Sequence, residues 1–272
     1  DDENVINVTN AYTPDNNDLS ITKKLVAMHG ADITDAKDDT FTFTVTAGQG
    51  VDTSKLNGKT FTASQEGKED QAVTFTKGSA TVTVTGEGTV TIKDLPLGNY
   101  QVGEDESSVA KELSGGYFTG SLVTEDKYDP NLTATKAGTV EIQNIYEAYK
   151  TLTIKKVVTG EMGTADDYFD FKVTGNNDAE FTLKDDQRPS TQEYSFKLNN
   201  DGSITLTHLK QGDTVTVAEK VDKGYTNKGI AVASKALIAP TDEGPGDYTI
   251  GNAKIDIRIP NTSEVDLGTV TF

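Results

Sequence analysis

Three residue types that can react with one another recur in the same order in both halves of the sequence. They are a lysine, a glutamate and an asparagine. The two sets are Lys23, Glu104 and Asn144, then Lys156, Glu219 and Asn261. A neutral lysine amine can attack the side-chain carbonyl of an asparagine, while a carboxyl group carries protons between them. The product would be an amide between two side chains, with loss of ammonia.

The flanking residues predict that all six side chains point into a core. "LSITKKL" leads to Lys23 and "LTIKKVV" leads to Lys156, each with apolar residues two and four positions earlier. "QVGE" and "TVAE" end at the two glutamates, and "EIQN" and "RIPN" end at the two asparagines. Side chains two apart in a strand share a face, so each polar residue is in phase with buried neighbours.

Burying one of these groups alone would cost several kcal/mol, so we expect the members of each set to meet. One interpretation is a buried lysine–glutamate ion pair with a hydrogen bond from the asparagine. The other is reaction, since burial favours the neutral amine and the protonated carboxyl group that the chemistry needs. The recurrence of all three residues in both halves favours reaction. Glu104 and Glu219 would then promote Lys23–Asn144 and Lys156–Asn261 bonds, without an enzyme, by proximity.

Composition predicts an all-β protein. Stretches such as "TFTFTVTAG" and "ATVTVTG" alternate with a period of two, and Gly, Asn and Asp separate them, as in antiparallel sandwiches. The net charge of −18 argues against a nucleic-acid partner. The 272 residues include no cysteine, and no apolar run is long enough to span a membrane.

The repeat predicts two tandem domains. Phe41, Phe43 and Val45 match Phe169, Phe171 and Val173 at a constant offset of 128 residues. "GTVEIQN", ending at Asn144, is matched with "AKIDIRIPN", ending at Asn261. We expect a first domain over 15–149, a second over 150–262, and a tail over 263–272. Residues 1–14 are either a strand of the first domain or a remnant of a preceding repeat, in which Asn10 would correspond to Asn144.

The ordered set "LxIxK … VxE … IxN" resembles the collagen-adhesin B-type (CnaB) domains of Gram-positive surface proteins. The two-domain arrangement is similar to streptococcal backbone pilins. The resemblance covers about 19–144 and 152–261 and implies inverse-immunoglobulin-like sandwiches with intramolecular isopeptide bonds. It also implies a cell-wall-attached, extracellular protein that is no enzyme, with neighbouring pilin subunits joined by sortase as partners. No LPxTG-type sorting signal occurs, which leaves pilus shaft and adhesin stalk as alternatives.

Other candidate sites are weak. His29 and His208 are expected in turns, and the acidic groups at 35–39, 166–167 and 185–186 lack the spacing of a calcium loop. We therefore expect no metal and no cofactor. Two further functions stay open: an adhesive module that binds a host protein or glycan through the long polar region Gly48–Gly86, and an accessory domain of a secreted hydrolase.

Overall fold

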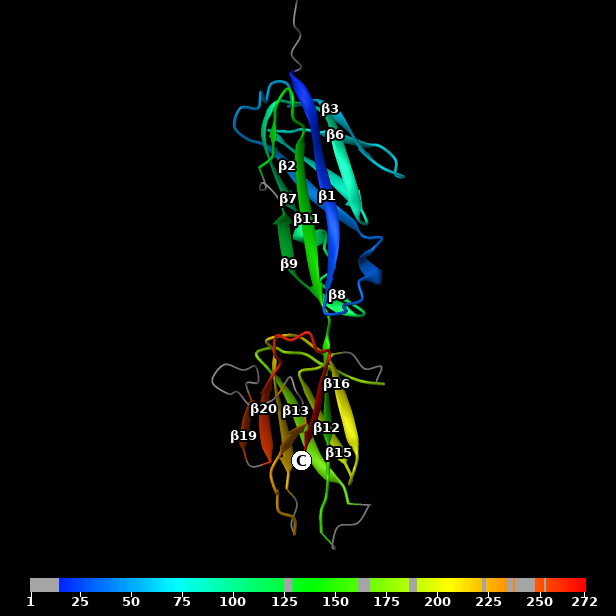
Figure 1. Cartoon of the computed structure of the whole chain (residues 1–272), viewed down its shortest axis with the longest axis vertical. Helices are drawn as coiled ribbons and strands as arrows, with labels where there is room; N and C mark the ends of the chain where they lie inside the picture. The colour runs from blue at the N-terminus through cyan, green and yellow to red at the C-terminus, as the bar shows by residue number, and fades with distance from the viewer. Residues whose placement is uncertain are drawn as a thin grey trace, which may run out of the picture. The chain divides into compact units, whose positions relative to one another are not determined.

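The computed structural model describes residues 15–124, 129–160, 167–185, 190–221, 224–233, 237, 248–251 and 253–272. These residues form strands and two short 3-10 turns, and none of them is in an α-helix (Figure 1). They divide into two compact units. The first takes its described residues from Asp1–Val26, Ile33–Lys111 and Phe118–Ile145, and the second from Ala27–Asp32, Glu112–Tyr117 and Tyr146–Phe272. The prediction of an all-β protein with two tandem sandwiches is confirmed.

Two sheets form the first sandwich. One has the strand order β4-β3-β6-β1-β11-β9-β8 and the other β10-β7-β2-β5. The bounds of the first sheet are β1 (Asn16–Met28), β3 (Thr60–Gln65), β4 (Gln71–Thr74), β6 (Gly88–Pro96), β8 (Glu112–Leu113), β9 (Gly116–Thr124) and β11 (Gly138–Glu147). Those of the second are β2 (Thr40–Ala47), β5 (Ser79–Thr85), β7 (Gly98–Glu104) and β10 (Asn131–Leu132). The short turns are η1 (Thr34–Ala36) and η2 (Glu106–Ser108).

The second sandwich repeats this plan. Its sheets have the orders β14-β16-β12-β21-β18 and β15-β13-β17-β20-β19. The bounds of the first are β12 (Lys150–Lys155), β14 (Thr182–Leu183), β16 (Ser203–Leu209), β18 (Ala231–Ala233) and β21 (Asp266–Thr271). Those of the second are β13 (Phe169–Asn176), β15 (Glu193–Leu198), β17 (Thr214–Lys220), β19 (Tyr248–Gly251) and β20 (Lys254–Arg258).

Alternation of polar with apolar residues decides which face of each strand is buried. In β2, Phe41, Phe43 and Val45 are fully buried while the intervening threonines face outward. Phe169, Phe171 and Val173 of β13 are buried in the same pattern. The repeated apolar residues therefore form the core between the two sheets of each unit.

The region Gly48–Gly86, in which a ligand-binding surface was expected, contains three strands. They are β3, β4 and β5. β4 is the edge strand of one sheet, with β3 beside it, and β5 is an edge strand of the other. Leu56, Val73 and Phe75 of this region are buried. The prediction that this region binds a ligand stays a prediction.

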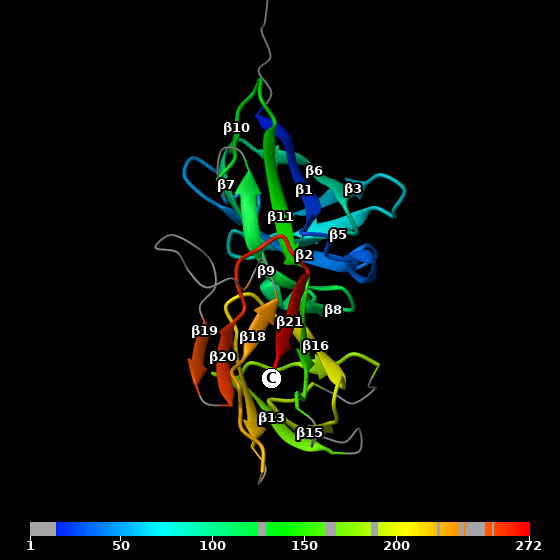
Figure 2. The ribbon, with the colours of Figure 1, turned by 60° about the horizontal axis from the view of Figure 1, so that its bottom comes forward.

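Residues 263–272 were expected to be a tail, and that expectation is wrong. They contain β21, which pairs in parallel with β12 and antiparallel with β18 in the first sheet of the second unit (Figure 2). Leu267 and Val270 of this strand are fully buried. Residues 1–14, including Asn10, lie outside the described residues.

Candidate functional site

Three strands of the first unit bring Lys23, Glu104 and Asn144 together. Lys23 follows the buried Leu19 and Ile21 in β1 and is itself fully buried. Glu104 ends β7 in the facing sheet, and Asn144 lies on β11, the neighbour of β1. The phase of each strand thus directs one polar side chain to the same part of the core.

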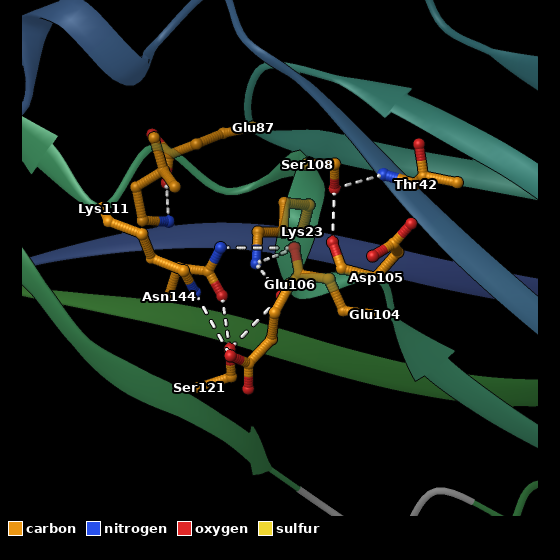
Figure 3. Close-up of polar contacts among 11 residues, drawn as sticks. Lys23, Thr42, Glu87, Glu104, Asp105, Glu106, Ser108, Lys111, Ser121 and Asn144 are labelled. Carbon is orange, nitrogen blue, oxygen red and sulfur yellow. Dashed lines mark hydrogen bonds and ion pairs between the residues drawn. The ribbon is translucent and has the colours of Figure 1, made fainter.

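Glu104 contacts both other members of the set. Its Oε1 lies 2.8 Å from Nζ of Lys23 and accepts a hydrogen bond from Nδ2 of Asn144 at 3.2 Å. Its Oε2 lies 3.0 Å from the same Nζ. The side chain of Glu104 is 4% exposed, so the three polar groups satisfy one another away from water (Figure 3). This arrangement holds an amine and an amide against one proton carrier.

Ser121 on β9 is a fourth member of this group, and sequence reasoning missed it. Its hydroxyl donates to Oδ1 of Asn144 at 2.8 Å and has Oε2 of Glu104 as an alternative acceptor at 3.3 Å (Figure 3). A donor to the amide oxygen polarises that carbonyl for attack. The stretch "GYFTGSLV" around Ser121 has no regular alternation, so nothing in the sequence directs this serine to the site.

The surroundings of Lys23 make its neutral form accessible. Burial lowers the pKa of Lys23 from its ordinary value to about 8, while the hydrogen bond and charge of Glu104 act in the opposite direction. The rings of Phe41 and Phe43 have their centres 4.9 and 6.0 Å from Nζ, so apolar carbon replaces water there. At pH 7 an amine with this pKa is neutral in about a tenth of the molecules.

The second unit contains a matching lysine–glutamate pair. Lys156 follows the end of β12, and its Nζ lies 2.5 Å from Oε1 of Glu219 on β17. The two side chains are 10% and 2% exposed. The ring of Phe169 lies 4.4 Å from Nζ of Lys156, in the place that Phe41 takes in the first unit.

The structure does not bring Asn261 to this pair, so its assignment as the partner of Lys156 is corrected. Asn261 is exposed and follows β20. β20 pairs with β17 just as β10 pairs with β7, so β20 corresponds to β10 and not to β11, the strand that carries Asn144. The carbonyl of the next residue, Thr262, accepts a hydrogen bond from Lys150 at the start of β12. Lys156 lies six residues further along this chain segment, a distance of about 20 Å in an extended strand.

A different amide lies near Glu219 in the described part of the chain. Nδ2 of Asn227 donates to Oε2 of Glu219 at 3.4 Å, a long hydrogen bond. Asn227 lies in an irregular segment after β17, is half-buried, and accepts a hydrogen bond from the backbone N–H of Gly229 through its Oδ1. Its geometry is looser than that of Asn144.

Lys150 is a further buried lysine that the sequence analysis did not select. Its side chain is fully buried, and Nζ contacts Oε1 of Glu147 at 3.2 Å and the carbonyl oxygen of Thr262 at 2.7 Å. An ion pair and a backbone acceptor satisfy the amine, as a structural role requires.

The remaining sequence candidates do not assemble into a site. His29 lies in a turn, as expected, whereas His208 lies in β16, so its expected place in a turn is wrong; both have positive φ angles, of 50° and 59°. Within the described ranges, no group of three His, Cys, Asp or Glu side chains could hold a metal ion. Asp166 and Asp186 lie outside those ranges. No helix in the described part of the chain is long and apolar enough to cross a membrane.

A family model described as a domain of unknown function (DUF7601) matches the chain twice, over residues 17–146 and 150–254. The chain therefore belongs to this family, and each of its two matched segments provides one lysine–glutamate pair. No curated protein matches the sequence.

Solved structures with similarity to this chain include pilus proteins. The major pilin of Streptococcus pyogenes is 18% identical with a TM-score of 0.41, over 94% of this chain and 97% of the pilin chain. The T-13 major pilin of the same species is 16% identical with a TM-score of 0.38, over 94% of each chain. A pilus-presented adhesin is 18% identical with a TM-score of 0.32, over 48% of this chain and 27% of its own.

Proposed function

We propose that this protein is a structural component of the bacterial cell surface, a pilus shaft subunit or an adhesin stalk, whose first unit is locked by an autocatalytic amide bond between Lys23 and Asn144. The observation that carries the proposal is the buried contact of Glu104 with both reacting side chains. The contact places one proton carrier against both the attacking amine and the amide nitrogen that leaves.

The reaction follows from the contacts. Glu104 takes a proton from the Lys23 ammonium group, and the neutral Nζ attacks Cγ of Asn144. Negative charge that develops on Oδ1 is stabilised by the Ser121 hydroxyl. Glu104 then delivers this proton to Nδ2, the Cγ–Nδ2 bond breaks and ammonia leaves, and Glu104 takes up the extra proton of Nζ as the amide forms. One C–N bond forms, one breaks, and no oxidant or cofactor takes part.

The position of the bond suits a protein that bears load. Lys23 lies on β1, the first described strand of the unit, and Asn144 lies on β11, its last strand and the neighbour of β1. Tension applied where the chain enters and leaves this unit would reach the amide before the sheets separate. The sequence has no cysteine, so an amide would take the place of a disulfide outside the cell.

The proposed setting is the cell wall of a Gram-positive bacterium, with neighbouring repeats or pilin subunits as partners, joined by sortase. The resemblance of the Lys23, Glu104 and Asn144 set, and of the Lys156–Glu219 pair, to collagen-adhesin B-type domains supports this setting. The strongly acidic composition keeps such an exposed protein soluble and away from nucleic acids.

Intact-mass measurement tests the proposal. We expect the 272-residue chain to weigh about 17 Da less than its sequence, the mass of one ammonia, and Asn144→Ala to restore the sequence mass. After protease digestion, tandem mass spectrometry should detect one branched peptide that contains Lys23 and Asn144. A chain at its full sequence mass would overturn the proposal and leave a buried ion pair.

A further inference from the structure

β5 is an edge strand of the first unit, and its own sequence gives the edge no protection. Its seven residues, Ser79–Thr85, end the sheet β10-β7-β2-β5. Proteins usually keep edge strands short, or place charges or prolines on them, because unpaired backbone groups can bind another strand. The other edge strands in the described ranges have two to six residues. The sequence of β5, "SATVTVT", contains neither a charged residue nor a proline.

The composition of β5 makes its edge prone to association. Segments of six or seven residues with high β-propensity, no charge and no proline are typical of strands that pair between chains. β15, the only other described edge strand of more than four residues, carries Glu193 and Lys197. β5 is therefore the edge for which a cover matters most.

Two glutamine side chains cover the outer edge of β5. Nε2 of Gln71 donates to the carbonyl of Thr83 at 2.8 Å, and Oε1 of Gln71 accepts from the N–H of Thr83 at 3.0 Å. Gln65 makes the same two bonds to Thr85, again at 2.8 and 3.0 Å. The hydroxyl of Thr83 donates a further bond to Oε1 of Gln71 at 2.8 Å. Each glutamine thus satisfies both backbone groups of one residue of β5.

The two amides reproduce the hydrogen bonds of an opposing strand. In an antiparallel pair, every second residue exchanges both of its N–H···O bonds with the residue opposite. Thr83 and Thr85 are two apart, and each exchanges these bonds with a side-chain amide in place of a backbone. Both amides come from the facing sheet, since Gln65 ends β3 and Gln71 begins β4. These two strands therefore close one side of the sandwich without adding a strand to the second sheet.

We propose that Gln65 and Gln71 act as a substitute strand that keeps the edge of β5 closed, and that this edge, once uncovered, pairs with β5 of a second copy of this chain. The partner follows from the strand itself. Antiparallel pairing of β5 with β5 is a two-fold symmetric contact, in which one surface serves both partners. It places threonine beside threonine on one face and valine beside valine on the other, and no charge opposes it.

The test replaces both glutamines by methionine, which keeps the length of the side chain but lacks the amide. We expect Gln65→Met/Gln71→Met to form assemblies of at least about twice the mass of the unsubstituted chain, as a symmetric pair requires, in light scattering after size-exclusion chromatography. Gln143→Met is the matched control and should not assemble, because Gln143 bonds to the side chain of Glu141 and not to backbone. Adding Thr81→Lys to the double variant should reverse the assembly, since like charges would face each other across the paired strands.

Amide hydrogen exchange of the single variants tests the cover itself, and it decides the matter if circular dichroism shows that the double variant does not fold. In Gln71→Met the N–H of Thr83 should exchange about tenfold faster and that of Thr85 at its normal rate, and Gln65→Met should do the reverse. Unchanged exchange at both threonines overturns the cover. A folded double variant with the mass of the unsubstituted chain overturns the pairing. Assembly that Thr81→Lys does not reverse takes place through another surface and overturns the pairing as well.

Discussion

Lys23 and Glu104 form a buried ion pair in which Nζ lies 2.8 Å from Oε1, and that same oxygen accepts the amide of Asn144. A carboxyl group that touches nucleophile and leaving group at once can accept a proton from one and deliver it to the other. The pair therefore predicts separate effects for removing the acid and for removing either reactant.

Removal of the acid from the first unit should stop the reaction while leaving both reactants in place. We expect Glu104→Ala to have the full sequence mass, because no other carboxylate contacts Lys23 among the described residues. Glu219→Ala should keep the single loss of ammonia, since its contact is to Lys156. Intact-mass spectra of the two variants make the comparison.

Asn261→Ala is the control that follows from the corrected assignment. Asn261 is exposed and lies near the Lys150 end of β12. We expect its substitution to change neither the mass loss nor the melting temperature by a measurable amount. One ammonia loss fewer than in the unsubstituted chain, about 17 Da when each chain is compared with its own sequence mass, would show that Asn261 had reacted and would restore the assignment made from the sequence.

The rate of bond formation should depend on the proton that Lys23 and Glu104 share. The pKa of Lys23 is lowered to about 8 by burial, so below that pH the pair holds the proton that Glu104 passes to Nδ2, and above it the proton is released. We expect the rate of ammonia loss, followed by mass after pulsed cell-free synthesis, to be nearly constant from pH 6 to 7 and to fall above about pH 8, by about tenfold at pH 9. A rate that keeps rising above pH 8 would contradict proton transfer through Glu104.

The same shift predicts how pH affects stability when the bond cannot form. In Asn144→Ala, the unfolded chain holds the lysine proton up to its ordinary pKa of 10.5, while the folded chain releases it near 8. Between these values the unfolded state binds more protons, so the free energy of unfolding should rise with pH. Urea unfolding of Asn144→Ala against Asn144→Ala/Lys23→Met isolates this effect, because the double variant lacks the titrating amine.

Much of the first site could be predicted from the sequence because local alternation encodes which face of a strand is buried. Lys23 and Asn144 each continue the apolar phase of two preceding residues, and both are fully buried. Glu104 does the same after Val102. The sandwich fold then places these three strands side by side or face to face, which brings the three side chains together.

The second site could not be completed in this way, because strand pairing is a long-range property. Two segments have the alternation of a last strand: β20, with Ile255 and Ile257, and β21 with the residue after it, through Val270 and Phe272. Because an asparagine follows β20, the sequence analysis matched β20 with β11, and this match is wrong. Only the register shows that β21 lies beside β12 and that β20 lies beside β17.

Ser121→Ala should slow the reaction without preventing it. Its hydroxyl donates to Oδ1 of Asn144, where negative charge develops. Removing a buried donor of this kind costs a factor of 10² to 10³ in rate. Ser121 is exposed, so water can replace part of the interaction and we expect a loss of about tenfold. Thr119→Val, on the same strand but bonded to the carbonyl of Ile145, is the matched control and should react at the normal rate.

The amide should stabilise the first unit mainly by restricting its unfolded state. Lys23 and Asn144 are 121 residues apart in sequence, and a cross-link that closes a loop of this length contributes about 4–5 kcal/mol in the chain-entropy estimate. A domain of this size has a total stability of about 5–15 kcal/mol. We therefore expect Asn144→Ala to melt at a clearly lower temperature than the unsubstituted chain, since the cross-link is lost while Lys23 keeps its partner Glu104.

Single-molecule stretching from the two ends should show an added extension as the first unit of Asn144→Ala unfolds, whereas in the unsubstituted chain the amide keeps the segment from Lys23 to Asn144 closed. Equal extension in both chains would mean that load does not pass through this bond, and the proposed mechanical role would then be wrong even if the bond forms.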